Sequence, residues 1–259
     1  MSACLIIARA AEKYAEELAR LADHQLPVQA CATAEEALKS YKDERILFGD
    51  PDMIAQIFSQ FPDIDWVQST WAGVTPLIEV DWRDYVLTAI KDVFGPQISE
   101  YVIGYLLAHE LKVLKRMEEQ GRHNWFAVAS GTLQGKQLGI MGTGSIGRHI
   151  AQMAAAFGMS VTGLSRSGAA TEGFDRVVPV TRLRTFLGGI DYLVSTLPHT
   201  PSTDNLLDKA ALERLPKHAY FINVGRGNVI DDDALIDALH HGRLSGAALD
   251  VFDEAVSYT

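Results

Sequence analysis

A glycine-rich stretch is one of two parts of this sequence best suited to chemistry. Residues 142–147 read GTGSIG and lie between an apolar strand pattern and a helical pattern. Gly142 permits a tight turn, Gly144 lets backbone approach a pyrophosphate, and Gly147 lets the helix lie close to the strand. The helix N-terminus then directs N–H groups and a positive dipole end at the phosphates. The alternative is a glycine turn without a ligand. The expected dinucleotide-binding residues here are Gly142, Gly144, Ser145, Ile146 and Gly147.

The next strand of the same unit ends at Ser165 and Arg166. NAD sites usually carry an acidic residue there, which accepts hydrogen bonds from the ribose hydroxyls. A guanidinium after a small hydroxyl residue suits a 2′-phosphate, because arginine can pair with it by charge and by two hydrogen bonds. We therefore predict that NADP(H) is preferred and that NAD(H) is possible. The alternative is that Arg166 is a solvated loop charge.

Arg226 is the second feature suited to chemistry. It follows the buried strand pattern FINV, and Gly225 and Gly227 remove side-chain bulk on either side of it. The guanidinium fork can bind the carboxylate of a 2-keto acid and polarise its carbonyl group. The alternative is an ion pair in a domain interface.

The elements that must position these residues alternate between short apolar runs and helical patterns. This alternation is typical of a parallel sheet covered by helices on both faces. In the first part of the chain the predicted strands lie within 4–8, 28–31, 45–49, 65–70 and 85–90, and the predicted helices within 10–23, 33–42 and 53–61.

A change of composition at 91–99, with Gly95 and Pro96, indicates a domain boundary. We place it between an N-terminal domain, 1–94, and a C-terminal domain, 95–259. Residues 99–120 are predicted to form one long helix capped by Ser99. Its first half is apolar nearly all round, so we expect that half to be buried between domains or subunits.

Five blocks of sequence together resemble the D-isomer-specific 2-hydroxyacid dehydrogenases, especially the glyoxylate/hydroxypyruvate reductase-like branch. They occur in family order and, with the glycine stretch, extend the resemblance over nearly the whole chain. The blocks are QSTWAGVTPL at 68–77, SEYVIGYLLA at 99–108, STLPHTPSTDNLLD at 195–208, FINVGRGNVIDDDALIDAL at 221–239 and GAALDVF at 246–252.

The resemblance implies two doubly wound parallel-sheet domains with the active site in the cleft between them. The first would be a flavodoxin-like substrate domain and the second a Rossmann NAD(P)-binding domain. Arg226 matches the family's catalytic, substrate-binding arginine, and Ala72 and Gly73 would bind the substrate carboxylate through their N–H groups. Trp71 and Thr75 depart from the family pattern, and Trp71 would narrow the mouth of the site. Further cofactor-binding residues implied are Leu197, Pro198, Val224, Gly225 and Asp250, the last meeting the nicotinamide carboxamide.

The proton donor of the family has no match in this sequence. Family members use a His in a TPH segment and a Glu five positions after the strand aspartate. That position here is Ala255, Glu254 is one residue early, and none of the eight histidines stands in an equivalent context. We therefore interpret the chain as truncated, by a frameshift, a gene-model end or cloning, and as lacking the C-terminal return helix. Loss of such an acid–base pair costs roughly 10²–10⁴ in rate.

Composition limits the partners and the location. A net charge of −10 and a pI near 5.2 argue against nucleic acid and anionic membranes as partners. Cys4 and Cys31 have no disulfide or metal-site spacing, so no metal is expected. Neither a leader nor an apolar membrane span is recognisable, which favours the cytoplasm. The apolar surface of the 99–120 region and the resemblance together predict a homodimer.

The sequence therefore predicts an NAD(P)-dependent 2-hydroxyacid dehydrogenase. It would transfer hydride between nicotinamide and a small 2-keto or 2-hydroxy acid of the glyoxylate or hydroxypyruvate class, with reduced activity. Two alternatives stay open: a catalytically silent NAD(P)-binding protein and a cofactor-gated interaction protein, which the fold alone does not exclude.

Overall fold

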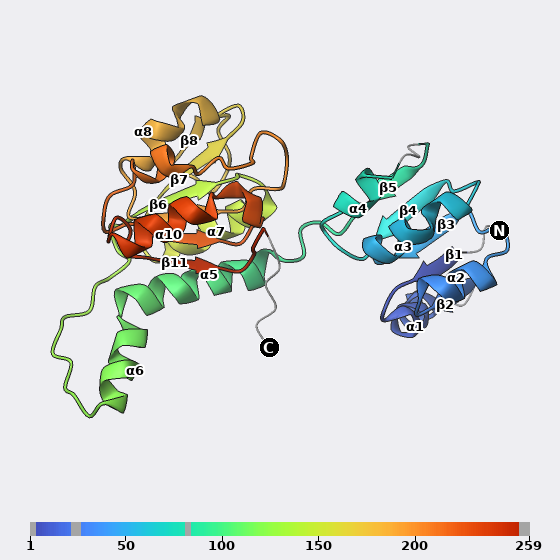
Figure 1. Cartoon of the computed structure of the whole chain (residues 1–259), viewed down its shortest axis with the longest axis horizontal. Coiled ribbons are helices and arrows are strands. Elements are labelled where there is room, and N and C mark those ends of the chain that lie inside the picture. The colour runs from blue at the N-terminus through green and yellow to red at the C-terminus, as the bar shows by residue number, and fades with distance from the viewer. Residues whose placement is uncertain (1–3, 22–26, 81–83, 254–259) are drawn as a thin grey trace. The chain divides into compact units, whose positions relative to one another are not determined.

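The structure is a computed structural model that describes residues 4–21, 27–80 and 84–253. The chain divides into two compact units, Met1–Lys91 and Asp92–Thr259, called here the N-terminal and C-terminal units. In each unit strands alternate with helices, as Figure 1 shows.

The N-terminal unit contains one parallel sheet in the order β2-β1-β3-β4-β5. This is the flavodoxin-like strand order, in which ligands bind at the carboxyl ends of the strands. The apolar side chains of β1, such as Leu5 and Ile7, are fully buried because helices cover both faces. The strands are β1 (Cys4–Ile7), β2 (Val28–Cys31), β3 (Ile46–Gly49), β4 (Trp66–Ser69) and β5 (Val86–Thr88), and the helices are α1 (Ala11–Leu21), α2 (Ala34–Ser40), α3 (Pro51–Ile57) and α4 (Thr75–Ile78).

The C-terminal unit contains a six-stranded parallel sheet in the order β11-β10-β9-β6-β7-β8. The order reverses between β6 and β9, which is the topological switch point of a dinucleotide-binding fold. The strands are β6 (Gln137–Met141), β7 (Ser160–Ser165), β8 (Arg176–Pro179), β9 (Tyr192–Ser195), β10 (Tyr220–Asn223) and β11 (Gly246–Leu249), and the helices are α5 (Gly95–Glu110), α6 (Val113–Gly121), α7 (Ser145–Ala156), α8 (Leu183–Leu187), α9 (Lys209–Leu212) and α10 (Asp232–His240). The two parallel sheets confirm the predicted α/β fold class.

The expected single helix over 99–120 is wrong, because the structure has two helices there. α5 ends at Glu110, α6 begins at Val113, and Lys112 between them has a left-handed backbone with φ 53°. The segment that follows α6 accounts for the break. The Gly131 N–H donates to the Glu110 carbonyl, and Lys112 Nζ donates to the Ala129 carbonyl. These partners are distant in sequence, so the helical pattern did not reveal them.

Ser99 does not cap a helix, contrary to expectation. It is buried inside α5, and its hydroxyl donates to the Gly95 carbonyl at 2.7 Å. Pro96 lies in the first turn of α5, where its missing N–H group costs no helical hydrogen bond.

The apolar half of α5 packs inside the C-terminal unit itself. Val102, Ile103 and Leu106 are buried in a core with Ile150 of α7 and Leu138 of β6. The expected burial between domains or subunits is therefore not needed to explain these side chains.

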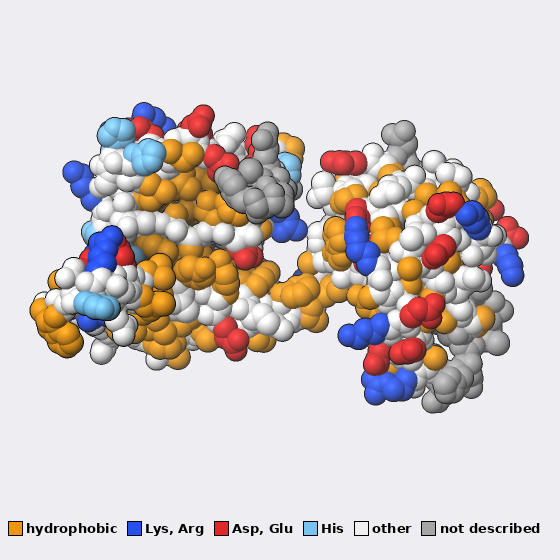
Figure 2. All heavy atoms as spheres, turned by 60° about the horizontal axis from the view of Figure 1, so that its bottom comes forward, with side chains coloured by type: hydrophobic (Ala, Val, Ile, Leu, Met, Phe, Trp, Pro, Cys, Tyr) orange, Lys and Arg blue, Asp and Glu red, His pale blue; other side chains and the backbone are white. Residues whose placement is uncertain are grey.

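A second set of apolar side chains on α5, α6 and the segment after them is exposed. Figure 2 shows hydrophobic side chains gathered on the face that carries these helices. Leu114 is 71% exposed, Met117 63% and Trp125 93%. Together with Tyr105 and Leu111 they are called here the α5–α6 surface. In the described part of the chain, no helix combines the length and apolar character needed to cross a membrane.

Candidate active site

The turn between β6 and α7 has the geometry that its three glycines suggest. Gly142 has φ 104°, a left-handed conformation that favours glycine, and its N–H donates to the Leu164 carbonyl on β7. A Cβ atom on Gly147 would lie 2.1 Å from the Gly142 carbonyl oxygen, so only glycine lets α7 approach the turn. The turn stands at the switch point of the sheet.

Gly144 leaves open space at the N-terminus of α7. A Cβ atom placed on it would meet no protein atom within 4 Å, in contrast to Gly147. Gly144 is also the N-cap residue, and no side chain caps the helix there. The N–H groups of Ser145, Ile146 and Gly147 in the first helical turn are therefore presented without a side-chain acceptor, which fits a phosphate group.

Ser165 and Arg166 lie at the end of β7, next to this turn. Ser165 Oγ accepts from the Gly168 N–H at 3.0 Å, which shapes the loop. Arg166 is exposed, and no ion pair to it occurs among the residues that the structure describes. Its guanidinium is available to an anionic group of a ligand.

The ends of β9 and β10 meet on the other side of the switch point. A Cβ atom on Gly225 would lie 2.6 Å from the Leu197 carbonyl oxygen, so a larger residue would push the two loops apart. Leu197 is partly buried, Pro198 is exposed and Val224 is buried. The Thr196 hydroxyl on the same loop donates to the Met141 carbonyl at the end of β6.

Arg226 projects from the loop after β10 and is exposed. Its Nη1 donates to the Gly225 carbonyl at 2.7 Å, and within the described chain it has no carboxylate partner. Asn223, fully buried, holds the loop: its Nδ2 donates to the Arg226 carbonyl at 2.9 Å and its Oδ1 accepts from the Gly225 N–H at 3.1 Å.

Asn223 was missed as a functional residue at the sequence level. Its position as the last residue of the strand pattern FIN was the available signal. A buried amide can satisfy a donor and an acceptor of one turn at once.

Asp250 follows β11 at the same edge of the sheet and is exposed. Its N–H donates to the Asn223 carbonyl at 3.0 Å, which aligns the two strand ends. The carboxyl edge thus brings together the glycine turn, Arg166, Arg226 and Asp250. All of them come from one unit, and parallel strands place their carboxyl ends on one side.

Ala72 and Gly73 lie in the N-terminal unit, on the loop between β4 and α4. Ala72 is exposed and Gly73 partly exposed. The Ser69 hydroxyl holds the backbone at the start of this loop. It donates to the Trp71 carbonyl at 2.9 Å and accepts from the Trp71 N–H at 3.0 Å. Trp71 itself is 40% exposed.

Three polar residues beside this loop were also missed. Arg9 follows β1, Asp50 follows β3 and Thr70 follows β4, so all three stand at the carboxyl edge of the first sheet. The Arg9 guanidinium donates a hydrogen bond to the Asp52 carboxylate, and this bond lowers the pKa of the Asp52 carboxyl group below its usual value. A charged residue directly after each of two buried strand patterns was the available signal.

Glu254 and Ala255, which stand near the position expected for the family's Glu, lie outside the described residues. His199 lies on the loop after β9, at the same carboxyl edge of the sheet as Arg226, and it is exposed. Among the residues described, no three side chains of the metal-ligating types His, Cys, Asp and Glu come together.

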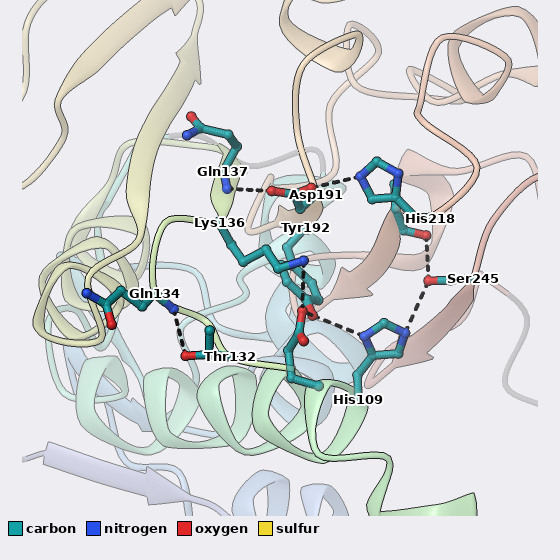
Figure 3. A network of polar contacts seen from close by, with 11 residues as sticks. His109, Thr132, Gln134, Lys136, Gln137, Asp191, Tyr192, His218 and Ser245 are labelled. Carbon is teal, nitrogen blue, oxygen red and sulfur yellow. Dashed lines mark hydrogen bonds and ion pairs between the residues drawn. The ribbon is translucent and has the colours of Figure 1, made fainter. Parts of the chain in front are cut away.

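The opposite, amino edge of the second sheet carries a polar network centred on His109 of α5. Figure 3 shows the His109 ring between Tyr192 and Ser245. Its Nδ1 lies 3.1 Å from Tyr192 Oη and its Nε2 lies 3.2 Å from Ser245 Oγ. The Tyr192 hydroxyl donates to Glu110, which also pairs with Lys136 at 3.3 Å. Burial and this carboxylate raise the pKa of Tyr192.

We expect His109 to make the stability of the C-terminal unit depend on pH. Burial lowers the pKa of His109 below 6.5, outweighing the carboxylate of Glu110, which acts in the opposite direction. The unfolded chain therefore binds this proton more readily than the folded chain. The contribution of the neutral imidazole to stability is full above pH 6.5 and is lost as the pH falls below that value.

Urea unfolding followed between pH 7.5 and pH 5 would measure this effect, and His109→Gln should flatten the curve. His199→Gln, at an exposed position, is the matched control and should leave the curve unchanged. An identical slope in the wild type and His109→Gln would contradict the assignment.

The strand order and the glycine turn at its switch point define a dinucleotide-binding protein. A profile of the D-isomer specific 2-hydroxyacid dehydrogenases, NAD binding domain, matches residues 103–257. The chain belongs to this family.

Individual relatives agree with the family. The chain is 32% identical over 156 residues to glyoxylate/hydroxypyruvate reductase A of Serratia proteamaculans, a match that covers 60% of this chain and 50% of that protein. The matches cover between half and about two thirds of the length of the glyoxylate/hydroxypyruvate reductases to which the chain is similar.

Solved structures extend the likeness to both units. A D-isomer specific 2-hydroxyacid dehydrogenase family protein from Aeromonas salmonicida is 36% identical, with a TM-score of 0.90 over 98% of this chain and 82% of that chain. An NADPH-dependent glyoxylate/hydroxypyruvate reductase from Sinorhizobium meliloti, solved with NADP and sulfate, is 26% identical, with a TM-score of 0.85 over 100% of this chain and 83% of that chain.

Proposed function

We propose that the chain is a reductase of small 2-keto acids of the glyoxylate or hydroxypyruvate class that uses NADP(H) as the hydride carrier. One observation carries the proposal: the edge that holds the glycine turn also presents the exposed guanidinium of Arg226, two strands away and without a carboxylate partner in the described chain. The activity named for the Serratia and Sinorhizobium relatives supports it.

Each residue has a definite part in this proposal. Bound nicotinamide supplies the hydride. Arg226 binds the keto acid and polarises its carbonyl, because a fixed positive charge stabilises the developing alkoxide. The N–H groups of Ala72 and Gly73 bind the substrate carboxylate. Asp250 accepts from the carboxamide, and Leu197, Pro198, Val224 and Gly225 border the cofactor.

We further propose that a protein of residues 1–259 binds the cofactor fully but reduces keto acids slowly. No histidine within these residues stands where the family places its proton donor, and such a donor is worth roughly 10²–10⁴ in rate. Water would then protonate the alkoxide.

Two measurements on purified protein test the proposal. NADPH titration should show one site per chain, and single-turnover oxidation of bound NADPH by glyoxylate or hydroxypyruvate should be slow but dependent on the keto acid. Binding without any oxidation would favour a silent or cofactor-gated binding protein. Failure to bind NADPH or NADH would refute the proposal.

Arg166 is expected to set the cofactor preference. Arg166→Ala should weaken NADPH binding about 10- to 100-fold, since a hydrogen bond to a charged group is worth roughly 1.5–3 kcal/mol. NADH binding should change little, because NADH lacks the 2′-phosphate. Arg176→Ala is the matched control: Arg176 is exposed at the amino end of the neighbouring strand β8. Equal losses for both cofactors would contradict the assignment.

The proposal includes a homodimer formed through the α5–α6 surface. Leu114 and Met117 are more than half exposed there, and apolar patches of this kind commonly mark interfaces. Sedimentation velocity should show a dimer that Leu114→Asp dissociates. Ile236→Asp, which changes an exposed apolar residue on α10, should leave it intact. A monomeric wild type would refute this part.

The proposed location is the cytoplasm. Cys4 and Cys31 are both buried and free, which suits a reducing compartment. Cell fractionation with both thiols tested for alkylation after unfolding would check it, and export would contradict it.

A further inference from the structure

Asp50 connects three strand ends of the N-terminal sheet. Its carboxylate accepts from the Arg9 N–H at 3.1 Å, from Arg9 Nη1 at 2.9 Å and from the Thr70 hydroxyl at 2.5 Å. Arg9 follows β1, Asp50 follows β3 and Thr70 follows β4. Since these strands are adjacent in the sheet, one side chain fixes the exits of all three.

The Asp50 carboxylate makes these contacts in place of the hydrogen bond with which it would cap helix α3. Asp50 is the N-cap residue of α3, yet its side chain makes no capping hydrogen bond. It is only 6% exposed, and a buried carboxylate needs partners because desolvation is costly. The orientation toward Arg9 and Thr70 therefore serves the strand exits and leaves the helix without its side-chain cap.

The contacts continue directly into the carboxylate-binding loop. Thr70 is 6% exposed and is separated from Ala72 only by Trp71. The Arg9 guanidinium lies over the Trp71 ring, 5.7 Å from its centroid, and also pairs with Asp52. Both the residue before Trp71 and the indole itself are thus tied to Asp50, either directly or through Arg9.

We propose that Asp50 is a positioning residue, which acts through Thr70 and Arg9 to hold the N–H groups of Ala72 and Gly73 ready for a 2-keto carboxylate. This inference rests on the proposed function, which assigns the substrate carboxylate to that loop. Preorganised donors bind an anion more tightly than a loop that must first be ordered.

Asp50→Asn is the primary test, because it preserves shape and removes the charge that holds Arg9. The probe is oxamate, an unreactive compound with the carboxylate and adjacent carbonyl of a 2-keto acid, titrated against NADPH-saturated protein. The variant should bind oxamate about tenfold more weakly and raise KM rather than lower kcat in keto-acid reduction. NADPH binding, which belongs to the other unit, should not change.

Asp65→Asn is the matched control. It removes the Arg45–Asp65 ion pair at the amino ends of β3 and β4, on the opposite edge of the same sheet. Oxamate should bind this variant as it binds the wild type. Equal oxamate binding by Asp50→Asn and the wild type would overturn the inference, and so would equal weakening in both variants.

Two further variants keep the test decisive should Asp50→Asn fail to fold. Thr70→Val removes the hydroxyl donor to Asp50, and Arg9→Met removes the guanidinium while keeping the backbone N–H of residue 9 that donates to Asp50. Each should weaken oxamate binding severalfold. Arg9→Met should also increase quenching of Trp71 by acrylamide, measured with Trp66, Trp82 and Trp125 changed to Phe. Unchanged quenching and unchanged oxamate binding would overturn the inference.

Failure of the inference can be told apart from failure of the proposed function. Protein that binds NADPH but not oxamate would overturn the role of the loop and of Asp50, and would leave the cofactor site standing. Protein that binds neither cofactor would refute the proposed function itself.

Discussion

Replacing Arg226 with methionine is expected to lower kcat/KM for keto-acid reduction by about 10³-fold while leaving NADPH affinity unchanged. Removing one preorganised donor to a developing oxyanion costs roughly 10²–10³, and Arg226 is also assigned to bind the substrate. Arg226→Lys keeps the charge but loses the fork, so its loss should be smaller, about 10²-fold. Single-turnover oxidation of bound NADPH at saturating protein measures the loss of keto-acid reduction for both variants.

The structure separates this effect from a loss of folding. Arg226 is exposed, and among the described residues its guanidinium donates only to the Gly225 carbonyl, so its removal should not change the free energy of unfolding. Arg243→Met is the matched control, since Arg243 pairs with Glu213 just before β11, at the amino edge of the sheet. Wild-type turnover by Arg226→Met would refute the role of this arginine.

Gly144→Ala should weaken NADPH binding about 10- to 100-fold without destabilising the protein. An alanine Cβ at this position meets no protein atom within 4 Å, and the backbone has φ −73°, which alanine adopts readily. A methyl group can then interfere only with a bound ligand, and forced overpacking costs roughly 1–3 kcal/mol. Fluorescence titration with NADPH and a thermal melt on the same sample measure the two quantities.

Gly147→Ala should differ from Gly144→Ala by lowering the stability of the protein in addition to weakening NADPH binding. Its Cβ would lie 2.1 Å from the backbone oxygen of Gly142, so α7 must move away from the turn. Gly104→Ala is the control: it places a methyl group in open space on α5 and should stabilise the helix by roughly 0.5–1 kcal/mol. Normal NADPH binding by Gly144→Ala would show that no pyrophosphate lies against residue 144.

Much of the fold follows from local pattern. The apolar runs at 4–8, 28–31 and 45–49 became β1, β2 and β3, because short buried runs between helical patterns are typical of parallel strands. The α/β class and the family are confirmed. The roles of the individual site residues remain predictions. The glycine turn, Arg166, Arg226 and Asp250 lie at one edge of the second sheet because each follows a parallel strand in the sequence.

The sequence by itself determined the strand–helix alternation, the glycine turn and the placement of Arg226 directly after a buried strand. Each of these depends on neighbouring residues or on a spacing within one element. Tertiary structure alone decided the break at Lys112, the inward turn of the Asp50 carboxylate and the hold of Asn223 on the Arg226 loop. The break and the Asp50 contacts depend on hydrogen bonds between residues 17 to 41 positions apart in the sequence. The Asn223 contact, although local, forms only because the strand end is buried. Periodicity and composition do not specify which distant donor will reach a given carbonyl or carboxylate, and the packed fold does.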